Sequence, residues 1–186
     1  MAIELFSSHQ TGRFSMRLSE LKENEFNHFY AAYLNRVKDE ELLEALTSSA
    51  EWFMDYTAGL TKEKMAFSYA PHKWSIAEVL LHIIDTERIF QYRAFRFSRK
   101  DQTPVPGFEQ DDYVRECDSK NRTKEDITEE FIAVRESSLQ LFKTMGTERL
   151  QYTGTASGMP WSVAALGFVI SGHAKHHLQI LEERYG

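Results

Sequence analysis

The chain has almost no cysteine and no long apolar run. Cys117 is the single cysteine among 186 residues, so no disulfide can form within the chain. The most apolar stretch, residues 163–170, is far shorter than the roughly 20 residues that a membrane-spanning helix needs. The first four residues, Met-Ala-Ile-Glu, also lack the basic start and apolar core of an export signal. We therefore expect a cytoplasmic protein without a membrane partner.

Basic charge is scarce as well. The 22 Lys and Arg residues are outnumbered by 28 Asp and Glu, which gives a net charge of −6. Because proteins that bind nucleic acid usually present an excess of basic residues, we expect no nucleic-acid partner. A basic and aromatic stretch at residues 88–100 is better explained by the end of a helix or by an anionic small molecule. The expected partner is a small-molecule substrate, and the sequence leaves a homodimer open.

Hydrophobic periodicity predicts four long helices. Apolar residues recur at helical spacing, and Ser75, Thr123 and Ser162 occupy positions typical of helix N-caps. The predicted helices cover approximately residues 38–59, 75–98, 123–146 and 162–185. Four amphipathic helices of similar length favour an all-α fold, with an antiparallel four-helix bundle as the simplest core.

The rest of the chain forms an N-terminal segment and one long loop. Residues 1–37 show no clear period, so we expect an irregular N-terminal arm packed on a bundle domain of residues 38–186. Prolines and a glycine mark residues 103–120 as a loop, and an acidic, aromatic piece lies at 108–113. This loop is long enough to act as a lid or as the wall of a site.

Two histidines, His173 and His177, lie four residues apart in the last predicted helix. At about 100° per residue, each falls roughly 20° from Leu166 in the middle of the apolar stripe, so both imidazoles point inward. Burying two polar rings is costly unless their nitrogens are satisfied. The same spacing lets one helix bind one metal ion. The pair is therefore either a satisfied pair of core histidines or part of a metal site.

A third histidine emerges from a repeated pattern. Residues 74–77 and 161–164 share the pattern Trp-Ser-aliphatic-Ala and begin the second and fourth predicted helices. His82 lies seven residues after the first of these serines, and His173 lies eleven after the second. These separations are close to two and three helical turns, so the histidines converge if both helix starts face the same side. The position of His82 on the flank of its apolar stripe permits this convergence without requiring it.

These residues resemble the DinB-like superfamily, also described as DinB/YfiT-like metalloenzymes. The resemblance rests on the Trp-Ser helix starts, on IAEVLLHIIDTER at 76–88 and on GHAKHHLQI at 172–180. It implies an antiparallel four-helix bundle that binds a divalent ion, most commonly zinc or nickel, through His82, His173 and His177. Characterised relatives are transferases and isomerases that use low-molecular-weight thiols such as bacillithiol or mycothiol. Many other members carry the general label of metal-dependent hydrolase.

Polar residues near His82 have structural as well as functional interpretations. Asp85 and Thr86 follow it by three and four residues, and either could hold its second ring nitrogen. We single out Asp85 as the candidate supporting residue, although a solvated or paired carboxylate would look the same. Glu78 fits a capping box, which favours a structural role. His176 lies about 80° from the centre of the apolar stripe, so we predict an exposed side chain.

The ligand set determines the predicted function. Three neutral imidazoles leave a divalent ion its full charge and an open position, as in catalytic zinc sites, whereas structural sites usually have four protein ligands. We therefore predict a divalent-metal-dependent enzyme, most directly a thiol-dependent S-transferase, because a thiol bound to a metal loses its proton without a general base. The alternatives are a metal-dependent hydrolase, a non-catalytic metal-binding bundle, and three core histidines without metal.

Overall fold

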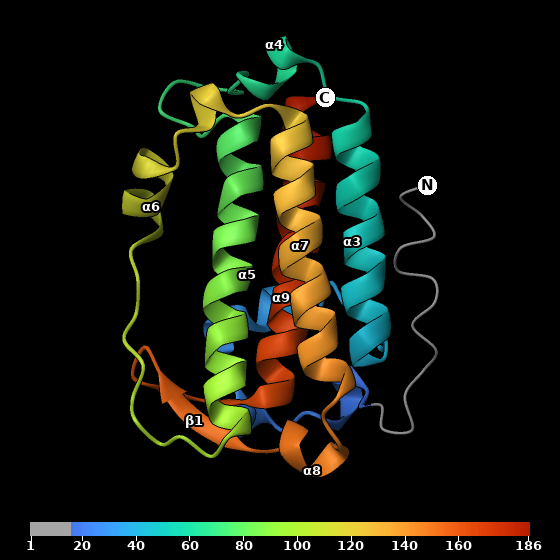
Figure 1. Ribbon diagram of the computed structural model, residues 1–186, viewed down its shortest axis with the longest axis vertical. Coiled ribbons are helices and arrows are strands. Elements are labelled where there is room, and N and C mark those ends of the chain that lie inside the picture. The colour runs from blue at the N-terminus through green and yellow to red at the C-terminus, as the bar shows by residue number, and fades with distance from the viewer. Residues whose placement is uncertain (1–15) are drawn as a thin grey trace.

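Four long helices form the body of the computed structural model, which describes residues 16–186 (Figure 1). They are α3 (Leu42–Ala58), α5 (Ile76–Ser98), α7 (Lys124–Lys143) and α9 (Val163–Tyr185). Helices α7 and α9 each pack against both α3 and α5. In Figure 1, α3 and α9 run in one direction and α5 and α7 run in the other. The predicted all-α four-helix bundle is confirmed, and among the described residues no helix is both long and apolar enough to cross a bilayer.

The starts of three long helices follow the predicted capping signals. The backbone N–H of Glu78 donates to Ser75 Oγ at 3.3 Å, and the Glu78 carboxylate accepts from the Ser75 N–H at 2.7 Å. Thr123 and Asp126 form the same reciprocal pair at the start of α7, with distances of 3.1 and 2.9 Å. Ser162 Oγ caps α9. Because these hydrogen bonds satisfy amides that have no partner within the helix, they fix where each helix begins.

The segment before α3 consists of short helical turns that pack on the bundle. These are η1 (Leu18–Glu20), η2 (Glu23–Glu25), η3 (His28–Tyr30) and α2 (Ala31–Leu34). Met16, Leu34 and Val37 are buried in the hydrophobic core. Lys38 has a φ of 57°, a left-handed conformation that interrupts helical geometry, so the helix predicted from residue 38 begins only at Leu42. Of the arm predicted at 1–37, residues 1–15 lie outside the described residues.

The connection between α7 and α9 contains a hairpin that the sequence analysis did not predict. Helix α8 (Thr147–Leu150) is followed by β1 (Thr153–Ala156) and β2 (Met159–Ser162), which pair antiparallel. Ser157 and Gly158 form the two-residue turn with φ values of 53° and 74°. Positive φ at both positions is what a type I′ hairpin turn requires. The short strands add a minor sheet to the helical fold.

The other two connections also carry short helices. Helix α4 (Lys62–Met65) lies between α3 and α5, whereas α6 (Gln110–Glu116) and η4 (Ser119–Asn121) lie between α5 and α7. Helix α6 packs beside α5 on the outside of the bundle (Figure 1). Residues 109–113 are exposed. The segment 103–120 is therefore partly helical, and its acidic side chains face solvent rather than forming the lid that its length suggested.

The interior of the bundle contains a buried ion pair. Arg135 on α7 donates hydrogen bonds of 2.8 Å to both carboxylate oxygens of Glu87 on α5. Ser138 on α7 donates to the same carboxylate at 2.8 Å, and Arg135 also donates to Ser49 Oγ on α3 at 2.7 Å. The two charged side chains are 0% and 2% exposed. This network therefore links α3, α5 and α7 and fixes their positions along the bundle relative to one another.

Candidate metal centre

Three histidine side chains meet between α5 and α9. His82 comes from α5, and His173 and His177 come from successive turns of α9. The Nε2 atom of His173 lies 3.0 Å from the Nε2 atom of His82 and 3.0 Å from that of His177. One nitrogen from each ring lies within 4.8 Å of the other two, and no Cys, Asp or Glu joins the cluster among residues 16–186. The predicted convergence of the three histidines is confirmed.

The cluster is buried on one side and reaches the surface on the other. His82 and His173 are 3% and 5% exposed, whereas His177 is partly exposed. The four-residue spacing on α9 places both of its histidines on the face that packs against α5. A molecule approaching from solvent would therefore meet the cluster from the side of His177.

Burial keeps the three imidazoles neutral at neutral pH. Desolvation lowers the pKa of His82 from 6.5 to about 4. The pKa values of His173 and His177 lie well below 6.5, chiefly because of burial and secondly because positive charges on neighbouring imidazoles would repel one another. Metals bind the neutral form of imidazole, so protons do not compete with a cation for this cluster at neutral pH.

Hydrogen bonds alone do not satisfy the cluster. The Nε2 atom of a neutral imidazole carries either one proton or one lone pair, so it makes one in-plane hydrogen bond. His173 Nε2, however, faces two other ring nitrogens at the same distance. A divalent cation accepts a lone pair from each nitrogen at once. The residues therefore fit a metal ion better than they fit a core network of hydrogen-bonded histidines.

Two aromatic side chains that the sequence analysis did not assign to the site flank the cluster. The Trp74 ring lies 4.9 Å from the His82 ring, and the Tyr33 ring lies 5.5 Å from the His173 ring. The backbone of Tyr33 can approach α9 closely because Gly172 has no side chain. A Cβ at position 172 would lie 2.3 Å from the Tyr33 carbonyl oxygen. Trp74 belongs to the repeated Trp-Ser pattern, whereas Tyr33 lies in a segment without periodicity and gave no signal.

His176 is half-buried and thus less exposed than predicted. Its ring packs edge-on against Tyr33, with ring centroids 4.8 Å apart. Burial lowers the pKa of His176, and the nearby Arg36 guanidinium lowers it further. Its Nδ1 atom is buried without a hydrogen-bond partner in the described part of the chain. His176 is therefore a neighbour of the three-histidine cluster and not a member of it.

Among the described residues, the polar side chains that neighbour His82 in sequence make no hydrogen bond with its ring. The Asp85 carboxylate lies 3.7 Å from the Arg88 guanidinium, and burial raises its pKa. Thr86 Oγ1 is buried without a partner among the described residues. Glu78 accepts from the cap residue of α5, as predicted. A supporting role for Asp85 therefore stays a prediction.

The basic residues of α5 are largely engaged within the protein. Arg88 pairs with Glu130 on α7, and Arg96 pairs with Asp101 at 2.6 Å. Arg93 is 1% exposed and donates hydrogen bonds of 3.1 Å that tie the segment after α5 to the hairpin turn. Arg93 and Arg96 lie toward the end of α5, Arg88 lies in its middle, and the ion pairs and hydrogen bonds of the described residues connect none of the three to the histidines.

Comparisons with other proteins agree with this geometry. The structure is similar to that of YfiT from Bacillus subtilis, which is described as a probable metal-dependent hydrolase with an unusual four-helix bundle topology. The TM-score is 0.64 at 13% sequence identity, over 89% of this chain and 92% of YfiT, a likeness that concerns the fold alone. No curated protein matches the chain significantly. The sequence profile of the DinB superfamily matches residues 10–181, so the chain belongs to the DinB superfamily.

Proposed function

We propose that the protein is a divalent-metal-dependent enzyme acting on a small molecule, with His82, His173 and His177 as metal ligands. The observation that carries this proposal is the position of His173 Nε2, 3.0 Å from two other ring nitrogens that burial keeps neutral. Imidazole ligands suit zinc and nickel as well as copper and iron, and the resemblance to the DinB-like superfamily favours zinc or nickel among them. A bound ion of this kind would lower the pKa of a water or thiol that binds beside it.

The surrounding residues position the three imidazoles and pack against them. Helices α5 and α9 hold the three imidazoles, and the network of Arg135 and Glu87 fixes α5 against α3 and α7. Trp74 packs against the ring of His82, and Tyr33 packs edge-on against the ring of His173. His177 remains partly exposed, so a substrate would approach there.

Transfer involving a low-molecular-weight thiol is the reaction we favour. No carboxylate belongs to the histidine cluster among the described residues, and Glu78 is hydrogen-bonded to its helix cap. Among the described residues the site thus offers no carboxylate placed as a general base, and without one a metal-bound thiol loses its proton more readily than a metal-bound water does. The description of YfiT supports metal-dependent hydrolysis as the second candidate. A non-catalytic metal-binding bundle is the remaining alternative.

Metal analysis of single variants tests the ligand assignment. His82→Ala, His173→Ala and His177→Ala should each remove most of the metal bound by protein purified without a histidine tag. His176→Ala is the matched control, because it removes an imidazole that packs edge-on against His177 but supplies none of the clustered nitrogens. The assignment is wrong if all four variants retain equal amounts of metal.

Cobalt-substituted protein distinguishes the two reactions. Addition of small thiols should produce a sulfur-to-cobalt charge-transfer band, and the same thiols should be consumed with a model electrophile only when metal is present. Metal-dependent hydrolysis of simple esters or amides, with no spectral response to thiols, would establish the hydrolase instead. Stable metal binding without either reaction would support the non-catalytic bundle.

A further inference from the structure

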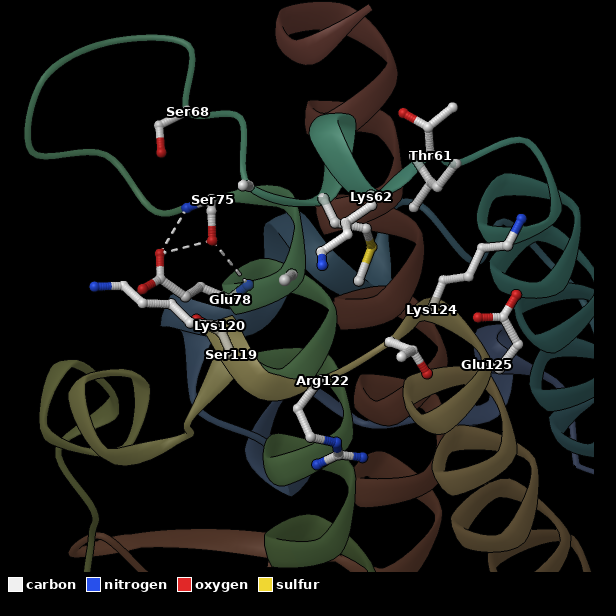
Figure 2. A pocket seen from close by; sticks show the side chains of 15 residues that line it. Thr61, Lys62, Ser68, Ser75, Glu78, Ser119, Lys120, Arg122, Lys124 and Glu125 are labelled. Carbon is white, nitrogen blue, oxygen red and sulfur yellow. Dashed lines mark hydrogen bonds between the residues drawn. The ribbon is translucent and has the colours of Figure 1, made fainter.

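A cavity of about 680 Å³ opens at the end of the bundle where α5 and α7 begin (Figure 2). Its walls are formed by the turn between α3 and α4, by α4 itself, by the first turn of α5 and by residues 119–125. None of the three clustered histidines lines it. This volume lies within the range of roughly 300–1,000 Å³ that is typical of sites for small molecules.

One part of the cavity wall is apolar. Leu60, Met65 and Ala77 line it with small apolar surfaces, since they are 6%, 5% and 3% exposed, and the exposed Ala66 beside them adds to this wall. Hydroxyl groups also line the cavity: Ser75 lies on the side of α5 (Figure 2), and Thr123 is the N-cap residue of α7. The wall is thus suited to a molecule that has an apolar body and a polar group.

Positive charge predominates in the lining, although the chain as a whole is acidic. Four basic residues line the cavity against two acidic ones. Arg122 pairs with Glu130, and Lys124 Nζ donates to a backbone carbonyl at the end of α3 at 3.2 Å. Lys62 and Lys120 make no hydrogen bond or ion pair with the residues that the structure describes. In Figure 2 the Lys62 side chain reaches toward the middle of the cavity, and Lys120 lies at its edge.

Backbone N–H groups add hydrogen-bond donors that, like the lysines, attract an anionic group. Helices α5 and α7 both begin at the cavity, and Ala77, Lys124 and Glu125 in their first turns line it. Amides in the first turn have no acceptor within the helix, and those of these three residues have none elsewhere in residues 16–186. Helix N-termini also carry partial positive charge. The cavity therefore combines mobile ammonium groups with fixed amide donors.

We propose that this cavity is a second ligand site, which binds a small amphipathic organic anion. The apolar body of the ligand packs on Leu60, Met65 and Ala77, and its anionic group lies near the Lys62 ammonium. A cationic ligand would meet like charge, and a neutral ligand would leave the ammonium groups without a counter-charge. This site is separate from the histidine cluster and does not depend on the reaction proposed for it.

Two related dyes test both the charge and the location. The probes are 8-anilinonaphthalene-1-sulfonate and its uncharged counterpart N-phenyl-1-naphthylamine, which share the same aromatic body. Fluorescence titration should show the sulfonate binding at least about fivefold more tightly, as expected for one or two favourable charge contacts. Equal affinities for the two dyes would overturn the proposal that the site selects an anion.

Substitutions at exposed positions locate the binding. The double variant Lys62→Gln/Lys120→Gln should weaken sulfonate binding and thereby reduce the difference in affinity between the two dyes. Lys64→Gln, on the same short helix but outside the lining, should leave it unchanged. Ala66→Trp places a large ring in the cavity and should abolish binding of both dyes. Unchanged sulfonate binding in the double variant or in Ala66→Trp, with native circular dichroism, would show that the dye binds elsewhere and that the proposal is wrong.

Discussion

Replacement of Arg135 by methionine tests how the bundle is held in register. Methionine keeps much of the length of the side chain but removes the charge and every hydrogen-bond donor. Glu87 would lose both of its 2.8 Å hydrogen bonds from the guanidinium and keep only the one from Ser138. Because Glu87 is 2% exposed, water cannot replace the lost partner. The variant thus leaves an unpaired carboxylate inside the bundle.

The expected cost follows from that geometry. Breaking a buried ion pair by removing one partner typically costs about 3–5 kcal/mol, a large fraction of the roughly 5–15 kcal/mol that stabilises a native domain. With an m-value of about 2–3 kcal/mol per molar urea, the midpoint of unfolding should fall by roughly 1–2.5 M. Glu130→Gln is the control, because it disrupts two partly exposed ion pairs, with Arg88 on α5 and with Arg122, and should cost less than about 2 kcal/mol.

A double-mutant cycle shows whether the cost arises from the unpaired charge. Glu87→Leu combined with Arg135→Met replaces the pair by apolar side chains, and such replacements are often neutral or stabilising. Urea unfolding should therefore place the double variant much closer to the native protein than the sum of the two single variants. Additive losses, or a loss below about 1 kcal/mol for Arg135→Met alone, would refute the account of this network.

Three further predictions concern the histidine site. In metal-free protein the folded-state pKa of His82 is about 4, so below about pH 6.5 the unfolded chain binds a proton that the folded chain does not. His82 should therefore lower the free energy of unfolding by about 3 kcal/mol between pH 6.5 and 4, and His173 and His177, whose pKa values are lowered as well, should add to this loss. His82→Gln should remove its share of the slope in denaturant titrations at several pH values. Gly172→Ala should lower the free energy of unfolding by about 1–3 kcal/mol and lower the Tm in thermal unfolding, because the added Cβ would overlap the Tyr33 carbonyl oxygen. If Asp85 supports a ligand imidazole, Asp85→Asn should weaken metal binding about 10- to 100-fold in calorimetric titrations, whereas a residue that only pairs with Arg88 would leave the titration unchanged.

Local signals explain what the sequence predicted correctly. A capping residue and its partner three positions later determine a helix start through contacts within one turn, so Ser75 and Thr123 could be recognised without knowledge of the fold. The histidine pair on α9 is equally local, because its spacing alone places both rings on one face. His82 required one added assumption, that the two Trp-Ser helix starts face the same side of the bundle. The convergence of the rings agrees with that assumption.

Features that depend on contacts between residues far apart in the sequence could not be predicted from local patterns. Tyr33 gains its place beside His173 from the close approach of two segments at Gly172, and neither segment reveals the other in sequence. No local pattern marks Arg135 as a buried residue, and only its pairing with Glu87 on another helix explains why a charged side chain lies inside the bundle. The Ser157-Gly158 turn is a short-range hairpin signal, but only four residues flank it on each side, too few to show an alternating pattern.

Helix α5 contributes to three parts of the molecule, and its rigidity links them. Its first turn lines the cavity through Ser75, Ala77 and Glu78, and one turn later it carries His82 toward α9. Further along, Glu87 fixes the helix against α3 and α7 through the buried network. A helix that is held at Glu87 and capped at Ser75 cannot slide or rotate without breaking one of these contacts. Interactions outside the cluster therefore set the position of His82 relative to the histidines of α9. No side chain of α5 forms a hydrogen bond with the His82 ring, but the fixed position of the helix still preorganises the three imidazoles.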